Sequence, residues 1–271
     1  MSMVDGDMGQ REVELDRPNA ARVYDYLIGG ELNYAIDRMF AEKILQVRPE
    51  ARDLALMNRQ WLRRAVRFGA EQGIRQFLDI GSGMPTVGHV HEVVQAIDPA
   101  CRVVYVDIEP IAVAHSKIVL QDIEDVAMVQ ADGERPEEVL EHPATERLLD
   151  LNEPMMVIMA AFVHFVPDAR NPAGMIARYR RVMAPGSYLA LSSGTFEGQG
   201  EEVRRAAELY RKSGTEVFAR SRAELSALVA GFDIVPPGIV FTPQWRPDDP
   251  GDVGEHPELA SQLALVARKN A

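Results

Sequence analysis

The chain contains one cysteine, Cys101, among its 271 residues. A single cysteine excludes an intramolecular disulfide, and no CxxC or Cys/His spacing typical of a metal site is present, so we predict no metal. No apolar run approaches the roughly 18–20 residues that span a bilayer, so we expect no membrane partner. Residues 1–16 are polar and acidic and lack the apolar core of a signal peptide. We therefore expect a flexible N-terminal stretch and a cytoplasmic protein.

Positive charge is scarce compared with negative charge. Lys+Arg total 29 against Asp+Glu 41, which gives a formal net charge of −12. Such a surface repels phosphate backbones, so nucleic acid is a poor candidate partner, although Arg59, Arg63, Arg64 and Arg67 form a local basic cluster. The hydrophobic fraction of 46% and the charged fraction of 26% are ordinary for a globular protein. The length suits one large α/β domain with a modest addition.

Three helical segments precede the first strand. Apolar residues recur at helical spacing over residues 17–30, 37–47 and 51–72. No linker rich in Gly, Ser or Pro separates these segments from the rest of the chain. We therefore interpret residues 17–72 as an N-terminal helical cap on a ligand-binding domain that spans residues 73–271.

Short apolar runs then alternate with helical segments. This alternation predicts βαβ units, and hence an α/β fold with a doubly wound, mostly parallel sheet that has helices on both faces. The last two strands have a Pro-rich loop between them and no room for a crossover helix, which favours an antiparallel hairpin at the sheet edge. The expected strands are 76–80, 102–107, 126–130, 155–161, 187–193, 232–240 and 262–268, and the expected helices are 88–97, 110–121, 135–149, 172–183, 201–212 and 222–231.

The stretch from Phe77 to Thr86 carries the clearest functional signal. An apolar run ends in Asp79 and is followed by a turn made of Gly81, Ser82 and Gly83. Glycine accepts positive φ and lets a ligand approach the backbone closely, and the next helix offers N–H groups to an anionic ligand. We predict that Asp79 and this loop bind a nucleotide-like ligand. A tight βα turn without a ligand is the alternative.

Acidic residues follow the next two strands, where ligands bind in doubly wound sheets. Asp107, with Ile108 beside it, comes after the second strand, and its carboxylate can accept from both ribose hydroxyls of an adenosine group. Asp132 and Gly133 follow the third, where an acid can accept from the adenine amine. Each acid has a purely local alternative as a helix or loop cap. Phe162 begins an apolar run after the fourth strand that suits a flat ring.

The nature of the ligand follows from the departures from a dinucleotide motif. A dinucleotide fold requires Gly-x-Gly-x-x-Gly, whereas Thr86 stands at the sixth position here. The terminal hairpin also differs from two mirrored mononucleotide halves. An adenosine ligand with a carboxylate and an amine near the glycine loop fits better, and S-adenosylmethionine (SAM) is such a ligand.

Further candidates lie outside the glycine loop. His164 is the one histidine at a strand end and is a candidate general base, with packing beside the cofactor as the alternative. In the cap, Tyr24 or Arg59 is predicted to reach the methionyl carboxylate. Three residues are predicted to contact substrate, although helical aromatics are usually core residues: Asn33, Tyr34 and Trp245.

These motifs resemble those of class I SAM-dependent methyltransferases. The first, second and third motifs of that class are similar to 77–83, 104–107 and 130–133. The whole chain is similar to the actinobacterial "S-adenosyl methyltransferase" family, long described as a domain of unknown function. The matching stretches are 17–30, 58–59, 77–86, 91–93, 104–107, 164–168 and 245–247.

The resemblance implies SAM as cofactor and a seven-stranded sheet whose last strand is antiparallel. It also implies that the Gly81 region holds the methionine end, Asp107 the ribose and Asp132 the adenine. Pro85 stands where the class often has a third glycine. No Asn-Pro-Pro-Tyr motif follows the fourth strand, which argues against methylation of nucleic-acid bases or protein glutamine.

We therefore predict an enzyme that transfers the methyl group of SAM to a small-molecule acceptor. Two alternatives stay open at this point. One is a non-catalytic regulator that binds SAM or adenosine, because no residue is compelling as a base. The other is a nicotinamide-dependent oxidoreductase, which the missing glycine and the terminal hairpin disfavour.

Overall fold

The computed structural model describes residues 15–85 and 88–270. Within them, no helix is both long enough and apolar enough to cross a membrane. Most of the expected flexible stretch, residues 1–16, lies outside the described residues, and so does Thr86. The helices are α1 Ala20–Leu27, α2 Ala35–Val47, α3 Ala51–Glu71, α4 Val90–Gln95, α5 Pro110–Leu120, α6 Pro136–Leu140, α7 Pro143–Leu148, α8 Pro172–Val182, α9 Glu201–Lys212 and α10 Arg222–Leu228. The strands are β1 Gln76–Ile80, β2 Arg102–Asp107, β3 Val126–Gln130, β4 Met156–Met159, β5 Tyr188–Gly194, β6 Asp233–Ile234, β7 Val240–Phe241 and β8 Gln262–Arg268.

The strands form one sheet in the order β3-β2-β1-β4-β5-β8-β6, with β7 also paired to β8. The first five strands along the chain pair in parallel, whereas β8 runs antiparallel to β5, β6 and β7. The expected α/β class, the parallel core and the antiparallel last strand are confirmed. Strand order reverses direction between β1 and β4, which is where such sheets bind ligands.

Three predicted elements differ in detail. The segment 232–240 pairs with β8 as two short strands, so the sheet has eight strands rather than seven. Pro236 and Pro237 lie between them and have no N–H group to continue the ladder. The expected helix 135–149 is two helices, α6 and α7. The fourth strand ends at Met159 rather than at residue 161, and Ala161 has a positive φ of 53°.

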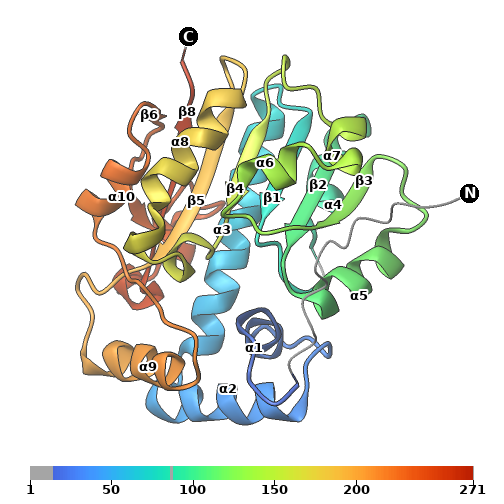
Figure 1. Ribbon diagram of the computed structural model, residues 1–271. Coiled ribbons are helices and arrows are strands. Elements are labelled where there is room, and N and C mark those ends of the chain that lie inside the picture. Colours follow the sequence, from blue (N-terminus) through green and yellow to red (C-terminus); the bar gives the residue numbers. More distant parts are fainter. Residues whose placement is uncertain (1–14, 86–87, 271) are drawn as a thin grey trace, which may run out of the picture.

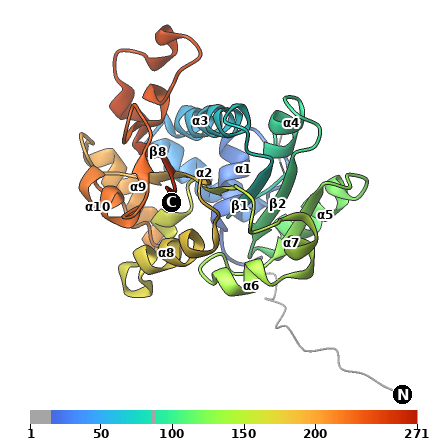
Figure 2. The same cartoon turned by 90° about the horizontal axis from the view of Figure 1, so that it is seen from above.

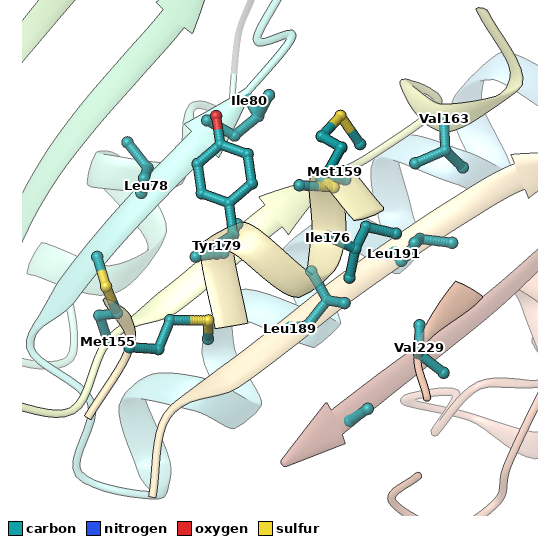
Figure 3. Packing of buried hydrophobic residues seen from close by; sticks show 14 of the residues in the cluster. Leu78, Ile80, Met155, Met159, Val163, Ile176, Tyr179, Leu189, Leu191 and Val229 are labelled. Atoms are coloured by element: carbon teal, nitrogen blue, oxygen red, sulfur yellow. The ribbon is translucent and has the colours of Figure 1, made fainter. Parts of the chain in front are cut away.

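Helices cover both faces of the sheet because its strands are apolar on both sides. Figure 2 shows α3 and α4 on one side and α6, α7 and α8 on the other. Side chains alternate along β1, so Phe77 packs under α3 while Leu78 and Ile80 face α8. Figure 3 shows the second of these cores, where Tyr179 and Ile176 of α8 lie over Leu78, Ile80, Met159 and Leu189.

A smaller core holds α1, α2 and α9 together beyond the carboxyl ends of the parallel strands (Figure 1). Val23 and Leu27 of α1, Phe40 and Ile44 of α2 and Ala206 of α9 are buried there. Helix α3 joins both regions. Its first turns belong to this smaller core, whereas Trp61 and the residues after it pack against the sheet. The 21-residue helix therefore fixes where α1 and α2 stand over the strand ends.

Candidate functional site

A cavity of about 390 Å³ lies at the carboxyl ends of β1 to β4. The segments that follow these strands form one side of it, and residues of α1 cover it. Figure 1 shows α1 directly beyond these strand ends. The cavity thus occupies the position at which doubly wound sheets bind ligands. The predicted site residues that line it are Tyr24, Arg59, Asp79, Gly81, Ser82, Gly83, Asp107, Ile108, Asp132, Gly133, Phe162 and His164.

The loop after β1 turns sharply because two glycines adopt positive φ, 72° at Gly81 and 71° at Gly83. The N–H groups of Gly81 and Ser82 both donate to the carbonyl of Val106, at 2.8 and 3.0 Å, which holds the loop against the end of β2. A Cβ atom on Gly81 would lie 2.6 Å from Cδ2 of Phe162. Both the backbone conformation and the missing side chain therefore keep this part of the cavity open.

Asp107 ends β2 and anchors the same loop. Its Oδ2 accepts from the N–H of Gly83 at 2.7 Å, and its Oδ1 accepts from the N–H of Glu109 at 2.9 Å. The second bond closes a turn just before α5, so the local capping role and a ligand role coexist. Each carboxylate oxygen has a further lone pair, so two hydroxyl groups can still be accommodated. Burial raises the pKa of this carboxyl.

Asp132 and Gly133 lie in the turn between β3 and α6. Asp132 Oδ1 accepts from the N–H of Glu134 at 3.0 Å, as the loop-cap alternative anticipates. The carbonyl of Gly133 accepts from the hydroxyl of Tyr179 at 2.9 Å, which ties the turn to α8. The turn is thus held rigidly beside the cavity. Its ligand role stays a prediction.

Gly133→Ala is expected to weaken SAM binding by about tenfold or more. A Cβ atom here would lie 2.4 Å from Cγ2 of Ile80 and 3.1 Å from Cζ of Phe162, so one wall must move into the cavity. Overpacking of this kind typically costs about 1–3 kcal/mol. Isothermal titration with SAM measures the effect. Gly198→Ala, at an exposed turn outside the cavity lining, is the control, and equal affinity of both variants would contradict the expectation.

Asp79 is buried at the end of β1 on the side of the sheet that faces α3. Burial raises the pKa of its carboxyl to about 7, although the nearby positive charge of Arg59 acts in the opposite direction. The neighbouring carboxyl of Asp107 raises the pKa further. A buried acid that titrates near neutral pH, next to a cation and open to a cavity, is the kind of group found at functional sites.

Tyr24 reaches the cavity from α1. Its hydroxyl donates to the carbonyl of Ala55 at 2.8 Å and accepts from Nδ2 of Asn58 at 3.3 Å. Asn58 Oδ1 in turn accepts from the hydroxyl of Ser192 at 2.7 Å, which links α1 and α3 to β5. The hydroxyl proton of Tyr24 is therefore held by the main chain of α3. Contact between Tyr24 and a ligand carboxylate stays a prediction.

His164 lies in a short helical turn after β4 and is buried, with 6% of its surface exposed. Its Nδ1 accepts from the N–H of Gly194, at 3.1 Å. Burial lowers the pKa of the imidazole to about 4, and the positive charge of Arg220 adds to the effect. The ring is therefore neutral at physiological pH. Its role as general base stays a prediction that these two features do not favour.

The three predicted substrate contacts do not line the cavity. Asn33 donates to Oδ2 of Asp25 at 2.8 Å and so holds the turn after α1. The ring of Tyr34 lies 5.5 Å from the guanidinium carbon of Arg22. Trp245 is fully buried in the core under α3 and does not line the cavity. In the described part of the chain these side chains pack the cap and the Pro-rich loop.

An ion network that the sequence analysis missed fastens α1 over the cavity. Arg22 is fully buried, and its Nε donates to Oδ2 of Asp37 on α2 at 2.8 Å. Its Nη1 donates at 2.8 Å to Oε1 of Glu109, which follows β2 and lines the cavity. Asn19 donates to the other oxygen of Glu109, also at 2.8 Å. No local sequence pattern pairs Arg22 with Glu109, 87 positions away, so the sequence analysis did not predict this contact.

Comparisons with known proteins agree with this geometry. Residues 7–270 match the model of the family described as S-adenosyl methyltransferase. The chain belongs to this family. Its cofactor is therefore SAM, and its fold is that of the class I methyltransferases. The predicted family membership and cofactor are confirmed.

Two solved structures are similar over nearly their whole length. A candidate methyltransferase from Thermobifida fusca YX is 35% identical, covers 98% of this chain and 100% of its own, and superposes with a TM-score of 0.91. A DUF574 family protein from Streptomyces avermitilis MA-4680 is 37% identical, with 95% of this chain and 100% of its own covered, and a TM-score of 0.91. No curated protein matches the chain.

The residues that line the cavity fit the cofactor of the S-adenosyl methyltransferase family. The bare backbone at Gly81 and Gly133 leaves room that a Cβ atom at either position would fill. Carboxylates stand at the ends of β1 and β2, where hydroxyl and ammonium groups can bind. Acidic side chains also suit a ligand whose sulfonium and ammonium groups are positively charged.

Proposed function

We propose that this protein catalyses transfer of the methyl group of SAM to a small-molecule acceptor. One observation carries the proposal: the Gly81–Gly83 loop, Asp107 and the Asp132–Gly133 turn line the same cavity, which α1 covers. Family membership supports the methyl donor. The small acceptor is supported by the size of the cavity, which lies in the range of sites for small molecules.

In this proposal the Gly81–Gly83 loop binds the methionine end, Asp107 the ribose, and Asp132 the adenine with Ile108 and Phe162 against its ring. Arg59 or Tyr24 contacts the methionyl carboxylate. When bound, SAM supplies a methyl group already activated by its sulfonium. The protein then has to hold donor and acceptor in line and exclude water. Holding two reactants in the reactive geometry can by itself accelerate the transfer strongly. Residues 17–72 act as the cap that excludes water.

Calorimetric titration with SAM, S-adenosylhomocysteine and NAD tests the cofactor assignment in this chain. We expect binding of the first two and none of NAD. Binding of NAD without SAM would overturn the proposal and restore the oxidoreductase alternative. Incubation with SAM labelled in its methyl group and a pool of metabolites then tests catalysis. Tight SAM binding with no transfer to any acceptor would favour the non-catalytic regulator.

SAM affinity is expected to rise about tenfold between pH 6 and pH 8, because the positive sulfonium and ammonium groups of SAM favour the ionised form of Asp79. In the free protein the carboxyl has a pKa of about 7 and is largely protonated at pH 6. Binding next to positive groups lowers that pKa, so a proton leaves on binding. Titrations across this range measure the slope, and Asp79→Asn is expected to flatten it. An unchanged slope in Asp79→Asn would assign the proton to another group.

The same group has an opposite effect on the stability of the free protein. Because its folded-state pKa lies above the ordinary value of 3.8, the folded state binds more protons than the unfolded state between about pH 4 and pH 7. The contribution of Asp79 to stability is therefore complete below pH 4 and is lost as the pH rises toward 7. SAM should relieve this loss, so stabilisation by SAM should be larger at pH 8 than at pH 6.

A further inference from the structure

The cavity extends beyond the residues assigned to SAM. Those residues follow β1 to β4 or lie on α1 and α3. Gln262, in contrast, belongs to β8, and His164 is hydrogen-bonded to Gly194 of β5. In the sheet, β5 and β8 lie beyond β4, on the side away from β2 and β3. Neighbouring strands are about 4.8 Å apart, so β5 stands roughly 10 Å from β1. This end of the cavity is free for the acceptor.

His164 presents a hydrogen-bond donor to this end. Because Nδ1 accepts from the N–H of Gly194, the single proton of the neutral ring is on Nε2. None of the hydrogen bonds between described residues uses Nε2. The N–H of Phe218 donates to the carbonyl of His164 at 2.7 Å and fixes the backbone. One hydrogen bond thus holds the backbone of His164 and another holds its ring at Nδ1, while the residue lines the cavity.

Gln262 also lines the cavity and carries an unsatisfied acceptor atom. Gln262 is the residue of β8 that pairs with Gly194 of β5, the same residue that donates to His164. Its Oε1 atom is buried and has no hydrogen-bond partner in the part of the chain that the structure describes. A buried carbonyl without a partner costs about 1–3 kcal/mol, so a ligand that donates to it regains that free energy.

The charges around this pair do not suit a cationic acceptor. Arg220 is buried near His164, where it pairs with Asp168 at 2.7 Å and donates to the carbonyl of Val166. Arg170 also lines the cavity and pairs with Glu134 at 2.7 Å. Asp168 does not line the cavity, and Glu134 lines it from the turn after β3, so neither carboxylate lies next to His164 and Gln262. His164 and Gln262 are themselves neutral, and the charged group that acts on the imidazole is the positive one of Arg220.

We propose that His164 and Gln262 form the acceptor-binding pair, with His164 donating from Nε2 and Gln262 accepting at Oε1. The acceptor is then an uncharged molecule that carries an oxygen atom and an N–H or O–H group side by side, as in an amide or a hydroxyl-bearing carbonyl compound. This inference rests on the proposed function. The acceptor's lone pair forms the bond to the methyl carbon, the carbon–sulfur electron pair stays on sulfur, and the proton of the acceptor passes to bulk water when the product leaves the site.

Nitrogen NMR of the histidine side chains tests the state of His164 without any activity assay. The protein is labelled with ¹⁵N and saturated with S-adenosylhomocysteine, and His164→Gln identifies the signal. We expect the Nε2–H form to persist unchanged from pH 8 to pH 5. A proton on Nδ1, or titration near pH 6.5, would overturn the inference. Failure of the unmodified protein to bind S-adenosylhomocysteine would instead overturn the proposed function.

Matched amide probes test the chemistry of the pair in the same complex. Benzamide has both a carbonyl and an N–H group, whereas N,N-dimethylbenzamide lacks the donor. We expect benzamide to bind at least about threefold more tightly, since one neutral hydrogen bond contributes roughly 0.5–1.5 kcal/mol. Equal binding of the two probes, or binding of neither, overturns the proposed acceptor class.

Two variants separate donation at Nε2 from a structural role or base catalysis. The amide of His164→Gln can donate from the position of Nε2, whereas the amide of His164→Asn reaches only the position of Nδ1 and can keep the bond to Gly194. We expect benzamide affinity to be largely retained by His164→Gln and reduced about three- to tenfold by His164→Asn. Equal loss in both variants, with S-adenosylhomocysteine still bound, contradicts the donor role.

Discussion

Asp107→Ala is expected to weaken SAM binding by at least about 100-fold. The carboxylate holds Gly83 and Glu109 through two backbone hydrogen bonds, so its loss releases the glycine loop as well as the predicted ribose contacts. Hydrogen bonds to charged groups contribute roughly 1.5–3 kcal/mol each, so the loss of two of them is enough to lower the affinity for SAM by more than about 100-fold. Titration with SAM measures the change directly.

Two further variants make this expectation specific. Asp122→Ala removes an exposed acid from the loop before β3 and controls for the change in net charge. Asp107→Asn keeps one acceptor oxygen and should therefore bind SAM with an affinity between those of Asp107→Ala and the unmodified protein. A fall of less than about tenfold in Asp107→Ala, with an intact fold, would show that Asp107 is a turn-capping residue without a ligand role.

Arg22→Met is expected to lower the free energy of unfolding by about 3–5 kcal/mol, because it leaves the buried charges of Asp37 and Glu109 without their partner. For a chain of this size that corresponds to a fall in melting temperature on the order of 10 °C. Asp37 keeps hydrogen bonds from the backbone of Asn19 and Tyr34, so we expect α1 and α2 to stay folded but to be held less firmly. Thermal unfolding followed by circular dichroism measures the change.

Arg52→Met provides the matched control in the cap. Arg52 is 40% exposed in its side chain and faces Glu42 at 3.7 Å, and surface pairs of this kind contribute about 0–1 kcal/mol. If both variants melt alike, the buried network does not hold the cap in place. Because Glu109 joins α1 to the end of β2 beside the cavity, we also expect Arg22→Met to bind SAM more weakly than Arg52→Met does.

The network also connects α1 to the predicted cofactor site. Glu109 follows Asp107 by two residues, and its backbone N–H donates to that carboxylate. Its side chain binds Asn19 and Arg22, at the start of the helix that covers the cavity. Movement of α1 therefore requires breaking contacts next to the predicted ribose site. This coupling is absent from the sequence because its partners lie on separate elements.

The sequence by itself determined the parallel sheet and the edge of it at which the cavity lies. Both depend on local rules: near-continuous apolar runs mark buried strands, and the residues directly after Ile80, Asp107 and Gln130 must lie at the carboxyl edge of such a sheet. The division of segment 232–240 into two short strands was less visible. It depends on where prolines interrupt pairing with β8.

Only the tertiary structure decided which distant side chains share the cavity. Arg22 is an ordinary helical arginine in the sequence, and its burial follows from acids brought to it by α2 and by the end of β2. Trp245 looked like a substrate contact, yet it lies in the core because α3 packs over it. The proton of His164 is placed by a backbone N–H from β5, 30 residues away. Such partners are set by packing across elements, for which the sequence has no local signal.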